Sequence, residues 1–518
     1  MASYQAPGVY IRYVTEGPLT IRAASTSTAV FIGRTRLGAG YDDTDDNFNR
    51  PPKVTTAREY AEQFANIGCN SGAVSLNTEN TADDDFMGFA VSGFFANGGT
   101  QAYIVSTNRD SGANAATGTM QLGTDGAAVA LEVQAKSAGT WGNDVSVQAS
   151  LSESGPEFVD IEVSLAYDGS ADNRKIERFV GIDRTQVVNI ISALVDISIA
   201  GAGAVDETLD LTVDPPAPIT LALTGGANPN ASAKTYANIL EELQGIDDIS
   251  LIVLPDREWS GGNGAPANAR ADINQAITHA QAMKDRMVLA QVGNPPDDWS
   301  ASGLPVSQFV SAYYPKANAI VKNGAGKNQN TEIGLTGHIA GVIARTDAVK
   351  GAWTAAAGVQ ADVKGIASLT RDISSVRQEA INSNNVNAIR YINGAPSVWG
   401  ARTRDTNGIY EYQPVTRTAF LIADSLRAAL QRVVFQKNTE VLWINLKASV
   451  SGFLTTLYAQ GAFQGGSASE AFEVACGLNE SMSQTEIDQG LLRVTVRFRP
   501  AKPAEFVEVS VEQLFENS

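Results

Sequence analysis

Histidine and cysteine are scarce in this chain. Its 518 residues include two histidines, His279 and His338, and two cysteines, Cys69 and Cys476. Cysteines so few and so far apart predict reduced, buried thiols, and no Cys/His spacing matches a metal site. A Ser-His-Asp triad would have to use one of the two histidines, and no G-x-S-x-G sequence surrounds any serine. We therefore expect a protein that is not an enzyme and that needs no metal or other cofactor.

Long apolar runs are also missing. No run approaches the roughly 18 residues that cross a membrane. Met1–Tyr10 carries no basic segment followed by an apolar one, so the sequence predicts no signal peptide, folding in the cytosol and no membrane insertion. The chain is 43% hydrophobic and contains 47 glycines and 19 prolines. This composition is typical of a globular protein rich in turns, and the length allows two to four domains.

Basic residues are in deficit, and the deficit lies in one half of the chain. The sequence holds 38 Lys and Arg against 56 Asp and Glu, a formal charge of −18. Residues 1–250 contain 14 basic and 32 acidic residues, whereas residues 251–518 contain 24 of each. Direct nucleic-acid binding needs basic surface, so an acidic chain argues against it. The excess acid is better explained as a solubilising outer face.

Two segments begin like known ligand loops and then depart from them. Gly324–Lys327 is similar to a phosphate loop, but Val321 and Asn328 stand where the Walker pattern needs glycine and serine or threonine. Asp43–Asn47 begins like an EF-hand loop whose sixth and twelfth residues are not the required glycine and glutamate. We interpret both as solvated loops, with an incidental cation at the second left open.

Short buried strands and one long helix define an α/β core, placed at residues 21–105 and 231–400. The helix is predicted over Ala267–Met283 by its periodic apolar residues. Phe94-Phe95 leads into a turn at Asn97–Gly99. Strand–helix–strand order implies a parallel-type sheet flanked by helices. The expected strands are Ala29–Gly33, Tyr103–Val105, Ile249–Leu254 (ended by Pro255) and Met287–Val292.

A β-rich domain is predicted as an insertion at residues 106–230. Residues 106–130 have a linker-like composition, and Val187–Val195 could be a helix. Residues 106–232 hold 6 basic and 17 acidic residues, so we expect this domain to project outward. Its expected strands are Leu131–Ala135, Val145–Ala149, Val159–Leu165, Leu209–Val213 and Ile219–Leu223.

The C-terminal part, residues 401–490, is predicted to contain two amphipathic helices. One apolar stripe is Ala423, Leu426, Leu430 and Val433, and the other is Leu446, Val450, Phe453 and Leu457. Asn438 is the expected N-cap of the second helix and Gly461 its stop. Residues 491–518 carry two strand patterns, Leu492–Phe498 and a second one made by Val507, Val509 and Val511.

Residues 1–20 are predicted to form an arm. Its strand has no partner nearby in sequence, so it pairs either within its own subunit or with a neighbour. The strand consists of Val9, Tyr10, Ile11, Arg12, Tyr13 and Val14.

Motifs spread over nearly the whole chain resemble the contractile phage tail sheath family, which includes the sheaths of phage-tail-like contractile injection systems. No single motif is decisive, but their order and spacing are. They are Ala6–Tyr10, Phe94–Gly99 with Tyr103–Val105, Trp141–Asn143, Ile339–Asp347 with Gly351–Trp353, Asn385–Arg390, Val398–Thr403, Phe435–Asn438, Gly490 and Pro503–Phe506. One departure is Arg12-Tyr13, where the family often has acidic residues, and it leaves the partners of the arm open.

The resemblance implies a structural subunit of a contractile tail sheath. Such a subunit polymerises helically around an inner tail tube and contracts to drive the tube through the envelope of the target cell. Its fold would be a mixed α/β multidomain one: a non-catalytic core of subtilisin-like shape, the inserted β-rich domain, a helical part and extended terminal β arms. Its implied partners are further copies of itself, the tube protein, and the baseplate and terminator proteins. The implied location is the virion tail, assembled in the bacterial cytoplasm.

Charge suggests which part faces the tube. Residues 402–447 hold seven basic and four acidic residues, a balance of +3 within a chain of −18. We expect this part to grip the tube, with Arg427, Arg432 and Lys437 as the candidates. Ordinary solvated helix charge is the alternative.

Two other classes of protein are possible in principle. An α/β enzyme would need the motifs that are missing, and a secreted surface-layer protein or adhesin would need a signal sequence or calcium repeats. Within the sheath family we favour a phage tail, and a bacterial contractile injection system is the alternative. The sequence does not separate these two.

Overall fold

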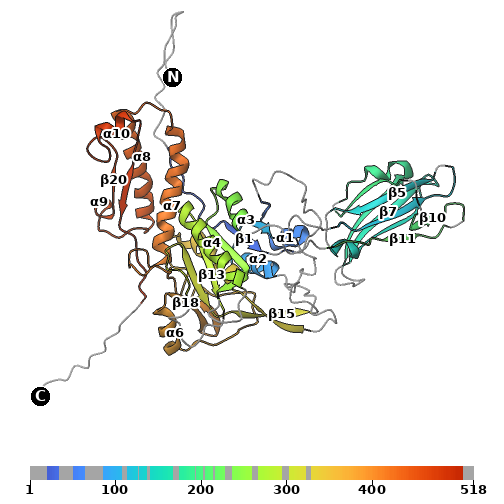
Figure 1. Ribbon diagram of the computed structural model, residues 1–518, viewed down its shortest axis with the longest axis horizontal. Coiled ribbons are helices and arrows are strands. Elements are labelled where there is room, and N and C mark those ends of the chain that lie inside the picture. Colours follow the sequence, from blue (N-terminus) through green and yellow to red (C-terminus); the bar gives the residue numbers. More distant parts are fainter. Residues whose placement is uncertain are drawn as a thin grey trace, which may run out of the picture. The chain divides into compact units, whose positions relative to one another are not determined.

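The computed structural model describes residues 20–33, 35, 51–64, 86–107, 114–126, 128–136, 140–166, 174–192, 194–201, 203, 205–213, 216–227, 236–259, 267–293, 303–322 and 328–505, and the structural statements below concern these residues. The chain divides into two compact units (Figure 1). The large unit comprises Ser25–Phe420 and Pro503–Ser518, and the small unit comprises Met1–Ala24 and Leu421–Lys502.

An eight-stranded sheet forms the centre of the large unit. Its strand order is β19-β18-β14-β13-β12-β1-β3-β2. The six inner strands are parallel, and only the edge strands β2 and β19 run antiparallel to their neighbours. The strands are β1 (Ala29–Gly33), β2 (Lys53–Val54), β3 (Ala102–Ser106), β12 (Leu251–Trp259), β13 (Met287–Val292), β14 (Val310–Tyr314), β18 (Val386–Ile392) and β19 (Ala395–Val398).

Both faces of the sheet are buried, which explains why its strands are apolar throughout. Phe31 of β1 belongs to one buried cluster, and Val30 and Ile32 belong to another, because successive side chains point to opposite faces. The predicted parallel sheet flanked by helices is confirmed. The first cluster includes residues of α1 (Ala57–Phe64), α2 (Phe86–Ala96) and α5 (Thr336–Lys350), and the second includes residues of α3 (Tyr236–Glu242) and α4 (Ala267–Met283).

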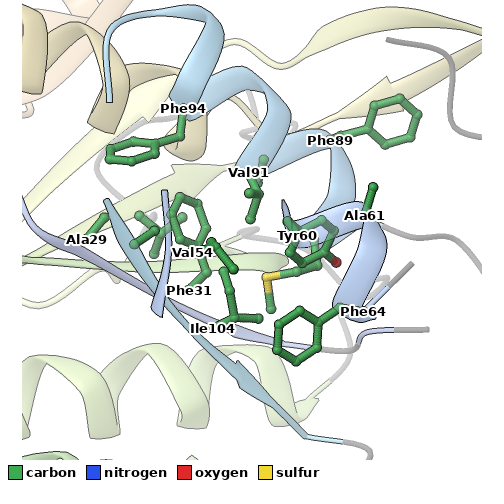
Figure 2. Close-up of a cluster of buried hydrophobic side chains, with 14 of the residues drawn as sticks. Ala29, Phe31, Val54, Tyr60, Ala61, Phe64, Phe89, Val91, Phe94 and Ile104 are labelled. Carbon is green, nitrogen blue, oxygen red and sulfur yellow. The ribbon is translucent and has the colours of Figure 1, made fainter. Parts of the chain in front are cut away.

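Aromatic rings lock α2 onto β1. Figure 2 shows Phe31 and Ile104 of the sheet facing Val91 and Phe94 of α2. The rings of Phe31 and Phe94 meet edge to face with centroids 5.5 Å apart. Such pairs contribute about 0.5–1.5 kcal/mol beyond the burial of their area. Phe94 of the Phe94-Phe95 motif thus packs the C-terminal end of α2 against the sheet, just before the turn at Asn97–Gly99.

One strand limit predicted from the sequence is wrong. β12 does not end at Pro255 but continues to Trp259. Its register with β13 shifts between Val253 and Glu258, and its pairing with β1 ends at Val253. Proline has no N–H to donate, so a strand tolerates it where the ladder is interrupted. Pro255 therefore lies within an irregular part of this strand and does not end it.

The predicted insertion is β-rich, as expected. It contains two four-stranded sheets, of order β10-β4-β5-β9 and β11-β6-β7-β8. Asn143 of the Trp-Gly-Asn motif exchanges two hydrogen bonds with the backbone of Gly226 at 2.8 and 3.0 Å, which joins the turn before β6 to the end of the insertion. The strands are β4 (Thr117–Leu122), β5 (Val129–Ala135), β6 (Val145–Leu151), β7 (Phe158–Ala166), β8 (Arg174–Asp183), β9 (Val195–Ile199), β10 (Glu207–Leu209) and β11 (Ile219–Ala222).

Three details of the insertion differ from the prediction. The strand expected at Leu209–Val213 is instead β10 at Glu207–Leu209, and a turn follows it. Residues 106–130 are not simply a linker, because β4 lies within them and buries Met120 and Leu122. The helix considered over Val187–Val195 is instead a 3-10 segment, Arg184–Asn189, followed by β9. Small polar residues hid the alternation of β4, and a short 3-10 turn produces the same apolar spacing as a helix.

Three further strands form a separate small sheet. β15 (Ala317–Lys322) lies between β16 (Asn328–Ile333) and β17 (Ser368–Leu369), and α6 spans Ser375–Asn382.

The small unit holds the predicted C-terminal helices. α7 (Gln413–Leu430) crosses into it, and α8 (Glu440–Ala459) buries Leu446, Val450, Phe453 and Leu457 as predicted. The stripe predicted for the first helix is only partly correct, since Ala423 is exposed and Val433 is buried. The remaining elements are α9 (Ala468–Ala471), β20 (Phe472–Ala475), α10 (Gln484–Asp488) and β21 (Thr495–Phe498), the last shorter than the predicted Leu492–Phe498.

The ends of α8 lie close to the predicted ones. Its N-cap is Thr439 rather than the predicted Asn438. The Asn438 side chain instead accepts a hydrogen bond from Trp443 Nε1 at 2.6 Å and donates one to the carbonyl of Leu491. Gly461 adopts φ +86° just beyond the helix, as expected for a C-terminal stop.

Candidate assembly surfaces

Both histidines are packed inside the large unit. His338 of α5 is buried against α2, so close that a Cβ on Gly93 would lie 2.4 Å from its ring. His279 of α4 is buried beside Arg286, with its Nε2 3.3 Å from Nη1. In the described part of the chain their polar partners are Arg286 and the backbone of Gly365, and neither is a nucleophile. The arrangement does not resemble a catalytic triad.

Burial lowers the pKa of His338 to about 4, and burial with the neighbouring Arg286 charge lowers that of His279 to about 4. Between pH 6.5 and 4, both histidines are therefore protonated in the unfolded chain but stay neutral in the folded chain. The free energy of unfolding falls as the pH falls through this window. We expect a loss of about 1.4 kcal/mol per pH unit for each histidine. Denaturation midpoints measured from pH 7 to pH 4 check this.

The comparison for this prediction is His338→Gln. It should be less stable at pH 7, yet its stability should fall less steeply than that of the wild type between pH 6.5 and 4. Equal slopes in the two proteins would mean that His338 does not contribute. The many carboxylates titrate equally in both proteins and so cancel.

Metal and membrane sites are not indicated. Among the described residues, no group of three or more His, Cys, Asp or Glu side chains could hold a metal ion. No helix in the same residues is long and apolar enough to span a bilayer. Cys476 is a buried thiol whose pKa is raised, mainly by burial.

The chain is fastened to the large unit just after the predicted N-terminal arm. Arg417 of α7 donates to Asp347 Oδ1 at 2.8 Å and to the carbonyl of Thr26 at 2.7 Å. The Thr26 hydroxyl donates to Asp347 Oδ2 at 2.6 Å. Arg417 and Asp347 are almost fully buried, and a buried pair costs about 3–5 kcal/mol to break from one side.

A second fastening precedes the predicted C-terminal arm. Arg402 donates through Nε and Nη2 to the carboxylate of Glu505, with the Nε contacts at 2.9 and 3.1 Å. Arg402 also pairs with Glu411 at 3.0 Å, and Tyr412 donates to Glu505 at 3.3 Å. A two-pronged Arg–carboxylate contact fixes direction as well as distance. The start of the C-terminal segment is therefore held by the large unit.

These fastenings reduce the basic surface predicted for residues 402–447. Arg402 and Arg417 are committed to buried or half-buried carboxylates, and Arg404 is buried and bonded to the carbonyls of Asn384 and Leu304. Three of the seven basic residues thus do not face solvent freely. The charge count of this stretch could not reveal this, because most of the partners lie outside it: Asp347, Glu505 and the carbonyls of Asn384 and Leu304.

The predicted tube-facing residues lie around the turn between α7 and α8. Arg432 and Lys437 are exposed, and Arg427 is 41% exposed while paired with Asp424 at 3.0 Å. We call residues 432–437 the α7–α8 tip. Its Phe435 is fully exposed at φ +69°, a backbone conformation that is strained for a bulky residue.

Apolar exposure around the tip was missed at the sequence level. Val434 of the tip and Val441 and Ile444 of α8 are each at least 60% exposed. The apolar run Val433-Val434-Phe435 in a turn could have signalled it, because only Val433 is needed for the small unit's core. Grouped exposed apolar residues are typical of interaction surfaces.

The small unit also carries a two-stranded ribbon. β20 and β21 pair antiparallel from Phe472–Phe498 to Ala475–Thr495. Among the described residues no further strand joins this sheet, so the outer edge of each strand is unpaired by any other strand. An open edge can accept an added strand through main-chain hydrogen bonds.

The overall architecture is similar to that of solved sheath proteins. The contracted helical sheath of the anti-feeding prophage aligns with 99% of this chain and 100% of its own, at 19% identity and a TM-score of 0.59. The contracted sheath complex of an extracellular contractile injection system, PVC, aligns over 99% of each chain at 18% identity and 0.52. The sheath tail protein of Desulfitobacterium hafniense aligns with 90% of this chain and 93% of its own, at 13% identity and 0.56. At such identities the likeness establishes the fold.

The sequence of the C-terminal part is more specific. Residues 405–513 match the family model of the phage tail sheath C-terminal domain. The C-terminal part is thus similar to the tail sheath family in sequence, and the chain as a whole has the fold of solved sheath proteins. The search of curated proteins found no match to this chain.

The stretch that matches the family model contains α7, α8 and the β20–β21 ribbon. It therefore includes Arg427, Arg432 and Lys437, the predicted tube-facing residues. The predicted arm strands, Val9–Val14 and Val507–Val511, lie outside the described residues, so their pairing stays a prediction.

Proposed function

We propose that this protein is the structural subunit of a contractile tail sheath, which polymerises helically around an inner tube and contracts to drive the tube through a cell envelope. The observation that carries the proposal is the sheath architecture over 99% of the chain, combined with the sheath C-terminal domain at residues 405–513. A virion tail is the proposed location, and a contractile injection system is the alternative. The proposed partners are further copies of itself, the tube, and the baseplate and terminator proteins.

Electron microscopy of the purified protein tests this function directly. We expect hollow helical tubes with a regular repeat once the protein is concentrated, because a head-to-tail contact that does not close generates a helix of subunits. Only discrete particles, at every concentration and in the presence of the tube protein, would count against the proposal.

The terminal arms would join subunits by adding strands to the ribbon of a neighbour. The β20–β21 ribbon has two outer edges, and each chain has two terminal strand patterns. In a polymer of identical subunits, each open edge can therefore receive one terminal strand from a neighbour. Main-chain pairing of this kind tolerates a change in the angle between bodies better than a packed interface does. The arms could therefore stay attached while the bodies move as rigid units.

Contraction would then run downhill from a trapped state. Extended and contracted packings differ in the contacts between subunit bodies. The extended packing would have the higher free energy, and a trigger at the baseplate would release it. The segment Gly324–Lys327 departs from the Walker pattern, which agrees with a process that does not use ATP. In this proposal the acidic β-rich insertion projects outward, the core has a subtilisin-like outline, and the predicted domain limits are kept.

The α7–α8 tip would contact the inner tube. Reversing both charges, Arg432→Glu with Lys437→Glu, should leave the stability of the free subunit within about 0.5 kcal/mol, since both side chains are exposed. Assembly around the tube should be strongly impaired and more sensitive to salt. Counting sheathed tubes in micrographs at two ionic strengths measures the effect.

A matched control is Arg371→Glu, an exposed residue of the large unit, which should leave assembly unchanged. Phe435→Ser should impair assembly without added salt sensitivity, because it removes an apolar contact. Normal sheathed tubes from the double charge reversal would show that these charges are merely solvated.

A further inference from the structure

A groove lies in the large unit beside α6, at the place where the described chain ends. Its lining comes from α6, from β18 and the loop after β19, from Ala357-Gly358, and from Ala504 and Glu505. The volume is about 870 Å³, within the roughly 300–1,000 Å³ usual for binding pockets. We call it the α6 groove.

Two polar atoms of the lining are buried without a hydrogen-bond partner among the described residues, Arg390 Nε and Asn382 Oδ1. Arg390 is held in place, because its Nη1 donates to Gln378 Oε1 at 2.8 Å and Gln378 Nε2 donates to the carbonyl of Trp399 at 3.0 Å. A buried polar atom without a partner costs about 1–3 kcal/mol. Among the described residues, Arg390 Nε therefore lacks an acceptor and Asn382 Oδ1 lacks a donor.

The charges of the groove are also unequal. Arg402 is satisfied by Glu505 and Glu411, whereas Arg390 has no carboxylate within ion-pair distance in the described part of the chain. Glu379, the other carboxylate of the lining, is exposed to water, which screens it. The chemistry that fits is an extended peptide, whose backbone supplies both a donor and an acceptor, with a carboxylate side chain for Arg390.

The chain itself contains such a peptide directly after Glu505, which lines the groove. Residues 506–518 follow Glu505 directly and contain three glutamates, Glu508, Glu512 and Glu516, and no basic residue. The Arg402–Glu505 contact fixes where this segment starts. Glu508 is three residues further on, so extended chain carries it at most about 10 Å. A tether this short gives an effective concentration on the order of millimolar.

We propose that in the free subunit the α6 groove binds residues 506–518 of the same chain, with Glu508 on Arg390. Docking there keeps a strand-forming segment from pairing prematurely with another copy, which is the hazard of exposed strands. Assembly then transfers the segment to a neighbour. Only this last step rests on the proposed function.

Hydrogen exchange of the full-length protein, at a concentration where it is monomeric, tests the docking. The amides of residues 507–511 should exchange about tenfold more slowly than in a free peptide of the same sequence, and Arg390→Glu should abolish the protection. Glu508→Arg alone should do the same, and it changes nothing within the body of the subunit. The double variant Arg390→Glu with Glu508→Arg should regain protection. Glu379→Gln is the matched control and should retain it.

Three results would overturn the proposal: no protection in the wild type, no effect of Glu508→Arg, or protection that appears only as concentration rises. The last result would assign the groove to a neighbouring copy. The proposed function is tested by a separate measurement, the formation of sheaths in electron micrographs. A protein that forms sheaths without this protection refutes the docking alone, and one that shows protection but never forms sheaths refutes the sheath function alone.

Discussion

Removal of residues 1–16 should give a folded protein that forms no sheaths. The first fastenings of the described chain lie beyond the deletion: Ala24 donates its amide to Ser425 Oγ at 2.9 Å, and Thr26 is bound by Arg417 and Asp347. Thermal unfolding of the free subunit should therefore be unchanged within experimental error. Assembly should fall below detection, because the proposed strand that would join subunits is gone. Micrographs and sedimentation of the concentrated protein measure this.

Proline variants sharpen this test without shortening the chain. Successive N–H groups of a strand point to opposite sides, so either Tyr10→Pro or Ile11→Pro must remove a main-chain donor from the added strand. One of the two should therefore block assembly, whereas Arg12→Ala, which keeps every donor, should assemble. If the truncated protein still builds sheaths, the N-terminal tether is wrong. If it does not fold, the arm belongs to its own subunit.

The α/β core was predictable because its signals are local. Buried parallel strands read as unbroken apolar runs, so the limits of β13 and α4 agree with the sequence prediction residue for residue. Pro255 misled because its effect depends on the neighbouring strands, and the ladder is interrupted where it lies. The basic surface of residues 402–447 misled for a similar reason. Whether Arg417 faces solvent is decided by Asp347, 70 residues away.

The family motifs prove to be packing and fastening features. Asn97 exchanges hydrogen bonds with the backbone of Lys364 and also donates to Gly93. Asn387, which lies in β18, likewise donates a hydrogen bond to the carbonyl of Arg402 and accepts one from its amide. These motif positions are restricted by geometry because backbones meet there. Motifs of this kind therefore predict the fold well, but they do not predict which residues form the contacts between subunits.

The closest approach between backbones predicts the largest effect on stability. Gly337 and Gly341 lie four residues apart on one face of α5, against α2. A Cβ on Gly341 would lie 2.3 Å from the carbonyl oxygen of Phe94, and one on Gly337 would lie 2.4 Å from that of Ala90. These neighbours are backbone atoms of a buried helix, so no rotamer change can relieve the overlap. The two helices would have to separate and open the core between them.

We therefore expect Gly341→Ala to lower the free energy of unfolding by about 3 kcal/mol, the upper range for overpacking, and Gly341→Val to leave no soluble folded protein. The matched control is Gly452→Ala on α8, where nothing lies within 4 Å of the added Cβ. That change should stabilise by about 0.5–1 kcal/mol, because alanine favours the helix. Chemical denaturation of the three proteins gives opposite signs for the two alanine variants if contact decides the outcome. Equal stability of Gly341→Ala and the wild type would show that α2 and α5 can move apart freely.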